Sequence, residues 1–200
     1  YNKAIELDPN YAVTYYNRGV MKYFLKDYYD AIADYNKAIE LNPSYTKAYY
    51  NRGIAKNKLE NHSGAITDFT KAIELDPNYA YPYITRGWSK NNLMDYYGAI
   101  VDFNKAIELD TNDDDAYYNR GLGYAYSGQY DKAIDDYTKA IELNPDDALA
   151  YYNRGVTYLD LEQYEEALKD WDKVIELDPN YQNAINNRNI LLEEHPELKP

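Results

Sequence analysis

The chain has 200 residues and no cysteine, which excludes disulfide bonds and thiolate metal sites. Its net charge of −13 lies entirely in residues 103–200, which carry 9 basic and 22 acidic side chains. Residues 1–102 carry 12 basic and 12 acidic side chains and are neutral overall. That acidic half would repel a phosphate backbone, so we expect no nucleic-acid partner. It either keeps the chain in solution or attracts a basic partner. No apolar run approaches the roughly 20 residues of a membrane helix, so we expect no membrane partner.

A 34-residue repeat runs through the whole chain. The phrase Tyr-Asn-Lys-Ala-Ile-Glu-Leu-Asp-Pro opens the sequence and returns, with small changes, at a constant spacing of 34. Such a period is typical of a stacked array, in which each unit buries its apolar face only against its neighbours. The chain begins within this phrase and without Met, so we interpret it as a piece of a longer protein. For that protein we expect a cytoplasmic location. The six copies of the phrase begin at Tyr1, Tyr35, Phe69, Phe103, Tyr137 and Trp171.

The pattern predicts two helices joined by a turn in each repeat. In the first complete repeat, apolar and small residues recur at a helical period from about Val13 to Leu25 and again from about Tyr29 to Leu41. The turn lies near Lys26–Asp27. Asn42–Pro43 ends the second helix, because proline cannot continue the helical ladder and the residue before it avoids helical backbone angles. A side-chain oxygen at the turn can cap the second helix. The residues at this capping position include Asp27, Asn61 and Asp95.

Small residues recur where the two helices of a repeat must approach each other. A glycine within a helix costs about 0.5–1 kcal/mol relative to alanine, so five glycines in register require a common gain. Close packing against the second helix is the evident gain, and we therefore interpret these residues as structural. The glycines of the first helix are Gly19, Gly53, Gly87, Gly121 and Gly155, and the facing alanines of the second helix are Ala31, Ala65, Ala99, Ala133 and Ala167.

The signature residues of the first full repeat are Tyr15, Gly19, Ala31, Tyr35, Ala38 and Pro43. With their equivalents every 34 residues, they resemble the tetratricopeptide repeat, a family marked by a spaced set of aromatic, small and proline residues. The resemblance covers essentially the whole chain. It implies an all-α solenoid of antiparallel helix pairs, stacked into a right-handed superhelix. It also implies that the first helices line a concave groove, which in this family holds a peptide or an extended segment of a partner protein.

The same register predicts one solenoid domain over residues 1–200. A lone second helix, at about Tyr1–Leu7, lies in a segment spanning residues 1–11. A terminal first helix runs from Gln182 to about Glu194, within residues 182–200. The five full repeats between them span residues 12–45, 46–79, 80–113, 114–147 and 148–181.

Three departures from the family pattern carry structural expectations. Thr111 replaces the turn proline, so the junction after the third full repeat should be looser. Asn189 replaces the packing glycine in the last helix. An arginine stands where the family usually has leucine, and we predict that it pairs with a partly buried aspartate of the second helix. The arginines are Arg18, Arg52, Arg86, Arg120, Arg154 and Arg188, and the aspartates are Asp34, Asp68, Asp102, Asp136 and Asp170.

A tyrosine and an asparagine recur side by side in the first helix without an evident role in the core. Asparagine is a mediocre helix former, but its carboxamide can donate to and accept from a peptide backbone at once. Tyrosine adds rigid apolar area with a polar tip. The resemblance implies that both rows face the groove, although the asparagines could instead bond only to neighbouring helices. The residues are Tyr16, Asn17, Tyr50, Asn51, Tyr118, Asn119, Tyr152 and Asn153, followed by Asn187 in the last helix.

Other positions on the same face differ from repeat to repeat, as residues that set specificity should. Trp88 is the strongest candidate anchor, because a lone tryptophan in a groove is a common hot spot. Packing alone is the alternative interpretation of this residue. The variable positions one turn after the asparagine are Val20, Ile54, Trp88, Leu122 and Val156, and those further along are Phe24, Lys58, Asn92, Tyr126 and Asp160.

The sequence contains no signal for catalysis. Its two histidines, His62 and His195, offer no evident geometry for a metal pair or a triad, and no glycine-rich phosphate loop is present. We therefore expect no enzyme, cofactor or metal, and predict an interaction scaffold that binds an extended peptide of a partner protein.

Three other functions compete with that of a peptide-binding scaffold. The two-carboxylate clamp of co-chaperones is disfavoured, because only Asn51 fits its pattern. The orphan terminal helices could instead drive head-to-tail self-association, a contact that need not close. The chain could also be the non-catalytic arm of a larger enzyme, since its asparagine row is similar to that of protein O-glycosyltransferases.

Overall fold

The computed structural model describes residues 1–198, which form twelve α-helices, one short 3-10 helix and no strand. None of these helices is long and apolar enough to cross a membrane. Even-numbered helices are the first helices of the repeats, and odd-numbered helices are the second. Their bounds are α1 (Asn2–Leu7), α2 (Ala12–Phe24), α3 (Tyr28–Leu41), α4 (Thr46–Lys58), α5 (His62–Leu75), α6 (Ala80–Asn92), α7 (Tyr96–Leu109), α8 (Asp114–Tyr126), α9 (Tyr130–Leu143), α10 (Ala148–Asp160), α11 (Tyr164–Leu177), α12 (Gln182–Glu194) and η1 (Pro196–Leu198).

The chain divides into two compact units, Tyr1–Leu109 (unit 1) and Asp110–Pro200 (unit 2). The boundary falls in the junction that carries Thr111 in place of proline. Unit 1 contains 13 basic and 13 acidic side chains, whereas unit 2 contains 8 and 21, so unit 2 holds the whole net charge. That residues 1–200 form one uninterrupted solenoid remains a prediction.

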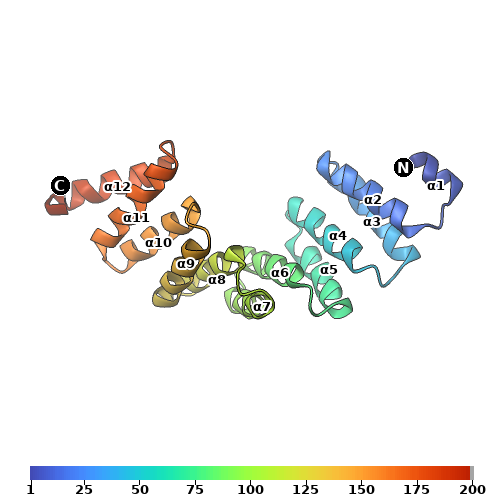
Figure 1. The fold of residues 1–200 in the computed structure, drawn as a ribbon, viewed down its shortest axis with the longest axis horizontal. Coiled ribbons are helices and arrows are strands. Elements are labelled where there is room, and N and C mark those ends of the chain that lie inside the picture. Colours follow the sequence, from blue (N-terminus) through green and yellow to red (C-terminus); the bar gives the residue numbers. More distant parts are fainter. Residues whose placement is uncertain (199–200) are drawn as a thin grey trace. The chain divides into compact units, whose positions relative to one another are not determined.

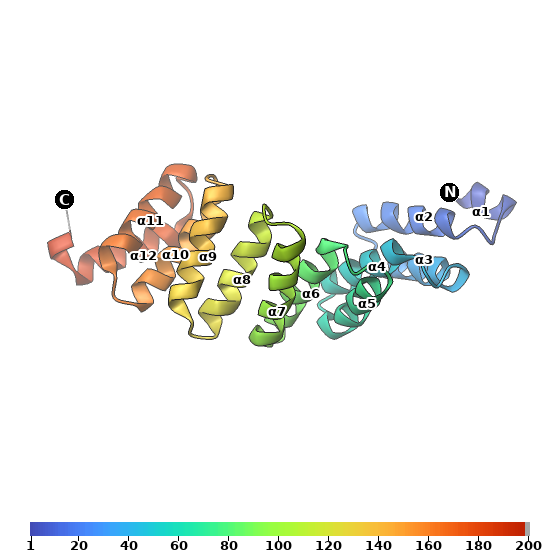
Figure 2. The same ribbon diagram turned by 60° about the horizontal axis from the view of Figure 1, so that its bottom comes forward.

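Each unit is built from helix pairs that pack on the next pair. In unit 1, α2 pairs with α3, α4 with α5 and α6 with α7, while α3 packs on α4 and α5 on α6 (Figure 1). In unit 2, α8 pairs with α9 and α10 with α11, while α9 packs on α10 and α11 on α12 (Figure 2). The all-α helical repeat solenoid predicted from the sequence is confirmed.

The repeated glycines lie against the aromatic ring that opens each repeated phrase. A methyl group at Gly53 would lie 2.5 Å from Cε1 of Phe69, and one at Gly155 would lie 2.7 Å from Nε1 of Trp171. Both rings are fully buried, so a side chain at either glycine would have to displace part of the core. The structural role predicted for these glycines is confirmed.

The predicted arginine–aspartate pairs form and tie three helices together. Arg52 donates from Nε and Nη2 to the two carboxylate oxygens of Asp68, at 2.9 and 2.6 Å, and from Nη1 to Asn36 of the preceding second helix at 2.7 Å. The arrangement joins α4 to α5 and back to α3. Arg188 of α12 pairs instead with Asp172 of the preceding helix. The other pairs are Arg18–Asp34, Arg86–Asp102, Arg120–Asp136 and Arg154–Asp170.

The predicted caps of the second helices form in two of three cases. Asn61 Oδ1 accepts from the backbone N–H of Gly64, and Asp95 Oδ1 accepts from that of Gly98, each at 3.0 Å. The prediction is wrong for Asp27, whose side chain makes no capping hydrogen bond in the described chain. An aspartate, Asp30, stands three residues after Asp27 where the other two repeats have glycine, and repulsion between the two carboxylates opposes this cap.

Candidate functional site

The first helices of each unit lie side by side. In unit 1, α4 contacts both α2 and α6, and in unit 2, α8 contacts α10. Successive second helices within a unit contact each other less. The contacts between successive first helices give each unit a continuous face. The tyrosine and asparagine rows lie on these helices.

The two rows are bonded to each other from repeat to repeat. Asn51 donates a side-chain N–H to the hydroxyl of Tyr16 in the preceding repeat, at 2.9 Å. The same bond recurs in unit 2. There, Asn153 donates to Tyr118 at 3.0 Å and Asn187 donates to Tyr152 at 3.2 Å. The sequence places tyrosine and asparagine side by side in one helix, but the bonds join residues 35 positions apart.

These bonds leave one donor and one acceptor available in each pair. The tyrosine hydroxyl accepts from the asparagine, and its own O–H donates to no group among residues 1–198. The carbonyl Oδ1 of Asn51 and that of Asn153 likewise accept no hydrogen bond within the described residues. The side chains of these two pairs, Tyr16 with Asn51 and Tyr118 with Asn153, are all half-buried.

The tyrosine rings are held by aromatic residues at the repeat junctions, which sequence reasoning missed. The Tyr16 ring lies 4.9 Å from that of Tyr45, and the Tyr152 ring lies 5.3 Å from that of Tyr181. An aromatic residue at the last position of a repeat was the available signal. Burial raises the pKa of Tyr118, an effect that its hydrogen bond from Asn153 only partly offsets. The hydroxyl is therefore a neutral donor near pH 7.

Tyr50, Asn119 and Asn17, three further predicted site residues, have other surroundings. Tyr50 packs on Tyr79 with ring centroids 5.3 Å apart, but Thr85 stands where the asparagine of the next repeat would be. Asn119 donates to the backbone oxygen of Asp115 in its own helix, at 2.7 Å. The side chain of Asn17 makes no hydrogen bond in the part of the chain that the structure describes.

Trp88, the predicted anchor, is 40% exposed on α6. Its ring meets that of His62 edge-on, with centroids 5.4 Å apart. His62 Nδ1 lies 3.1 Å from Asn57 Oδ1, and Asn57 exchanges hydrogen bonds with the buried Ser89. Trp88 thus combines exposed area with a fixed position, which suits either an anchor or a packing role.

The electrostatics of the arginine–aspartate pairs differ between the units. In unit 1 a lysine one turn after each arginine adds a second cation, as Lys22 does at 3.0 Å from Asp34. Burial raises the pKa of Asp34, but hydrogen bonds from Arg18 and Lys22 outweigh burial and hold this pKa below its ordinary value. In the two full repeats of unit 2, tyrosine replaces this lysine, as Tyr124 does after Arg120. Burial accordingly raises the pKa of Asp136 above its ordinary value, despite the bond from Arg120.

Models of the same repeat family match most of the chain. A tetratricopeptide repeat model matches residues 12–45, 46–79 and 148–181, a second one matches residues 103–135, and a TPR repeat model matches residues 121–161. The chain belongs to the tetratricopeptide repeat family. Arrays of this family are protein-interaction scaffolds and are generally non-catalytic, so this chain is a scaffold for protein or peptide partners.

Solved structures of other tetratricopeptide arrays are similar over 82–94% of the chain. YrrB, described as a TPR protein with an unusual peptide-binding site, is 30% identical, with a TM-score of 0.78 over 94% of this chain and 97% of its own. MamA is 29% identical, with a TM-score of 0.76 over 82% and 96%. MamA from Desulfovibrio magneticus RS-1 shares the fold at 23% identity, with a TM-score of 0.80 over 85% and 96%. No curated protein sequence matches the chain.

Proposed function

We propose that the chain binds an extended peptide segment of a partner protein along the tyrosine and asparagine rows of its first helices. The observation that carries the proposal is the bond from asparagine to the tyrosine of the preceding repeat. It fixes both side chains and leaves a tyrosine O–H and an asparagine Oδ1 available in each pair.

A peptide backbone offers the complementary groups. A backbone C=O accepts from the tyrosine O–H, and a backbone N–H donates to the asparagine Oδ1. Because every residue but proline carries both groups, such a row binds an extended chain with little regard to its side chains. Positions such as Val20, Trp88 and Leu122 would then select among sequences. The peptide-binding site named for YrrB supports this choice of ligand.

We infer that unit 2 prefers a basic segment, because it carries the whole net charge. Asp115 lies on α8, one turn before Asn119. Burial and the neighbouring Asp114, Asp113 and Asp147 raise the pKa of Asp115, so a basic side chain would relieve this repulsion. Attraction of this kind speeds association and weakens as salt is added.

The proposal is tested with a phage-displayed library of random linear peptides, captured on the immobilised chain. Asn51→Ala and Asn153→Ala remove one acceptor from unit 1 and one from unit 2, respectively. Asn78→Ala and Asn180→Ala are matched controls at exposed junction positions, where only the backbone N–H is hydrogen bonded. Each selected peptide should bind the variant of the unit that it occupies several-fold more weakly, and the controls as tightly as the wild type. Failure to select any peptide, or equal binding by every variant, would overturn the proposal.

Head-to-tail self-association is the weaker candidate. Leu7 is 80% exposed and Ile190 is 53% exposed, so both ends carry apolar surface. However, Asn189 occupies the position where the other repeats have glycine against an aromatic ring. Its side chain would collide with the ring of a second helix stacked on α12 in the usual geometry. A sedimentation experiment that finds a concentration-dependent oligomer would revive this candidate.

A further inference from the structure

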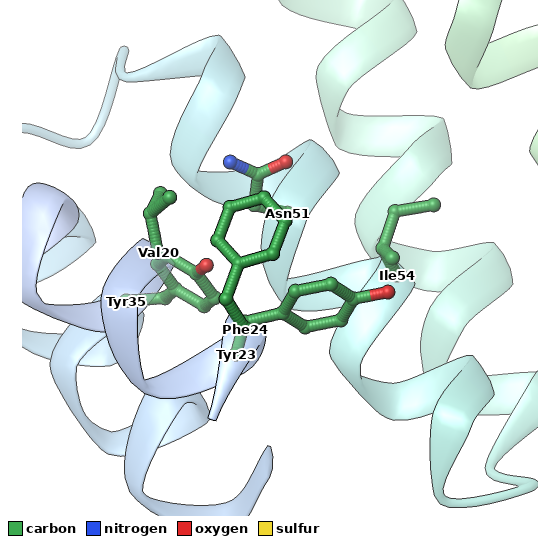
Figure 3. Close-up of a pocket in the computed structure, with 6 residues that line it drawn as sticks. All are labelled: Val20, Tyr23, Phe24, Tyr35, Asn51 and Ile54. Carbon is green, nitrogen blue, oxygen red and sulfur yellow. The ribbon is translucent and has the colours of Figure 1, made fainter. Parts of the chain in front are cut away.

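A small pocket opens between α2 and α4 in unit 1, on the face that carries the tyrosine and asparagine rows. Figure 3 shows Phe24 and Tyr23 projecting from α2 toward α4, with Asn51 and Ile54 across from them and the Tyr35 ring alongside Val20. The lining residues are Val20, Tyr23, Phe24, Tyr35, Asn51 and Ile54.

The size of the pocket limits what it can hold. Its volume is about 100 Å³. An apolar protein cavity of about 150 Å³ accepts a benzene molecule, whereas a single water occupies about 30 Å³. The pocket is therefore too small for a drug-sized ligand, which needs about 300 Å³ or more. It suits one aliphatic side chain.

The walls of the pocket are uncharged and mostly apolar. Val20, Ile54 and the aromatic rings supply apolar contact, and no lysine, arginine, aspartate or glutamate lines it. Phe24 is 73% exposed, and an apolar occupant would remove part of this ring from water, at about 25 cal/mol per Å². Asn51 also lines the pocket; its amide N–H donates to Tyr16, and its Oδ1 accepts no hydrogen bond among the described residues.

The next repeat does not reproduce these walls. The counterpart of Ile54 is Trp88, the counterpart of Phe24 is Lys58, and that of Asn51 is Thr85. A bulky indole thus replaces an aliphatic side chain, a charged amine replaces a phenyl ring, and a hydroxyl replaces a carboxamide. The pocket between α2 and α4 is therefore a local feature and not a property of every repeat.

We propose that this pocket anchors one aliphatic side chain of an extended peptide, namely leucine, isoleucine, methionine or valine. The backbone N–H next to that residue donates to Asn51 Oδ1. The inference rests on the proposed function and adds the class of residue that unit 1 selects.

The test uses the same phage-displayed random peptides on three further variants. Val20→Phe fills the pocket, and Phe24→Ala widens it at an exposed position where folding is not at stake. Val101→Phe is the matched control, because Val101 is exposed on the second helix α7 and does not line the pocket.

Peptides that depend on Asn51 should share one aliphatic position. Val20→Phe should weaken their binding about tenfold or more, as expected for one buried aliphatic side chain, while Val101→Phe leaves it unchanged. Phe24→Ala should shift the selected residue toward phenylalanine or tryptophan. Peptides that depend on Asn51 but lack an aliphatic preference, or that ignore both pocket variants, would overturn the inference while the proposed function stands. If no peptide binds the wild type, both fail.

Discussion

Asn153 donates a side-chain N–H to the hydroxyl of Tyr118 across 3.0 Å, which links α10 to α8 on the face proposed to bind peptides. A hydrogen bond of this kind contributes about 0.5–1.5 kcal/mol to stability. Tyr118→Phe and Asn153→Ala should each destabilise unit 2 by about that amount, and the double variant by less than the sum. Urea unfolding of the four proteins measures this coupling.

Tyr50→Phe is the matched control for that cycle. Thr85 stands where an asparagine would bond to Tyr50, so removing this hydroxyl breaks no comparable contact. The variant should unfold within about 0.5 kcal/mol of the wild type, as is usual for substitutions that remove no specific interaction. The bond between the repeats contributes nothing to stability if the losses in Tyr118→Phe and Asn153→Ala simply add in the double variant. The same conclusion follows if Tyr50→Phe loses as much stability as Tyr118→Phe.

Lys22→Met should make the stability of unit 1 less dependent on pH. The folded-state pKa of Asp34 is lowered, so its ion pairs stabilise the fold above the unfolded-state pKa of about 3.9 and lose this effect as pH falls through the lowered value. Without Lys22 that pKa should rise. The free energy of unfolding of Lys22→Met should be about 1 kcal/mol below that of the wild type at neutral pH. This difference should vanish once Asp34 is protonated in both the folded and the unfolded state.

Carboxyl NMR titration and urea unfolding at several pH values measure both effects. Asp30→Asn serves as the control, since Lys22 also lies 3.6 Å from this exposed carboxylate. A pH-independent loss in Lys22→Met would mean that the lysine acts by packing and not by charge.

Gly53→Ala and Asn189→Ala should have opposite effects at the same repeat position. The added methyl of Gly53→Ala meets the Phe69 ring at 2.5 Å and should cost about 1–3 kcal/mol. Asn189 is exposed, and alanine is the better helix former, so this substitution should stabilise by a few tenths of a kcal/mol. Thermal unfolding compares the two, and Gly53→Ala with Phe69→Leu should recover part of the loss. A harmless Gly53→Ala would contradict the packing role.

The turn between α6 and α7 contains Met94 in the left-handed backbone region, at φ 62°. A side chain there costs about 1 kcal/mol or more, whereas glycine adopts this conformation freely. Met94→Gly should therefore stabilise unit 1 by up to about 1 kcal/mol. Gly128 holds the equivalent turn of unit 2 at φ 76°, and Gly128→Ala should destabilise it by a similar amount. The denaturant midpoint should rise in Met94→Gly and fall in Gly128→Ala. Midpoints that move in the same direction would contradict the argument from backbone strain.

The repeat pattern predicts most of the fold because its causes are local or recur every 34 residues. Helix ends follow from Asn42–Pro43 and its equivalents, and the pairing of Arg52 with Asp68 follows from two charges fixed on facing helices. Position in the repeat does not say how far one hairpin is shifted against the next. The bond from Asn51 to Tyr16 depends on that shift and could not be predicted. The missing cap at Asp27 depends on one neighbouring charge.

The most direct test of the peptide-binding face is an NMR titration of the side-chain amides with a peptide selected from the random library. The Asn51 or the Asn153 amide signals should move, according to the unit that binds, because both side chains lie where the peptide backbone would run. Asn36, on the second helix α3 and bonded to Arg52, should stay still. Shifts confined to Asn36 and other second-helix residues would contradict the account.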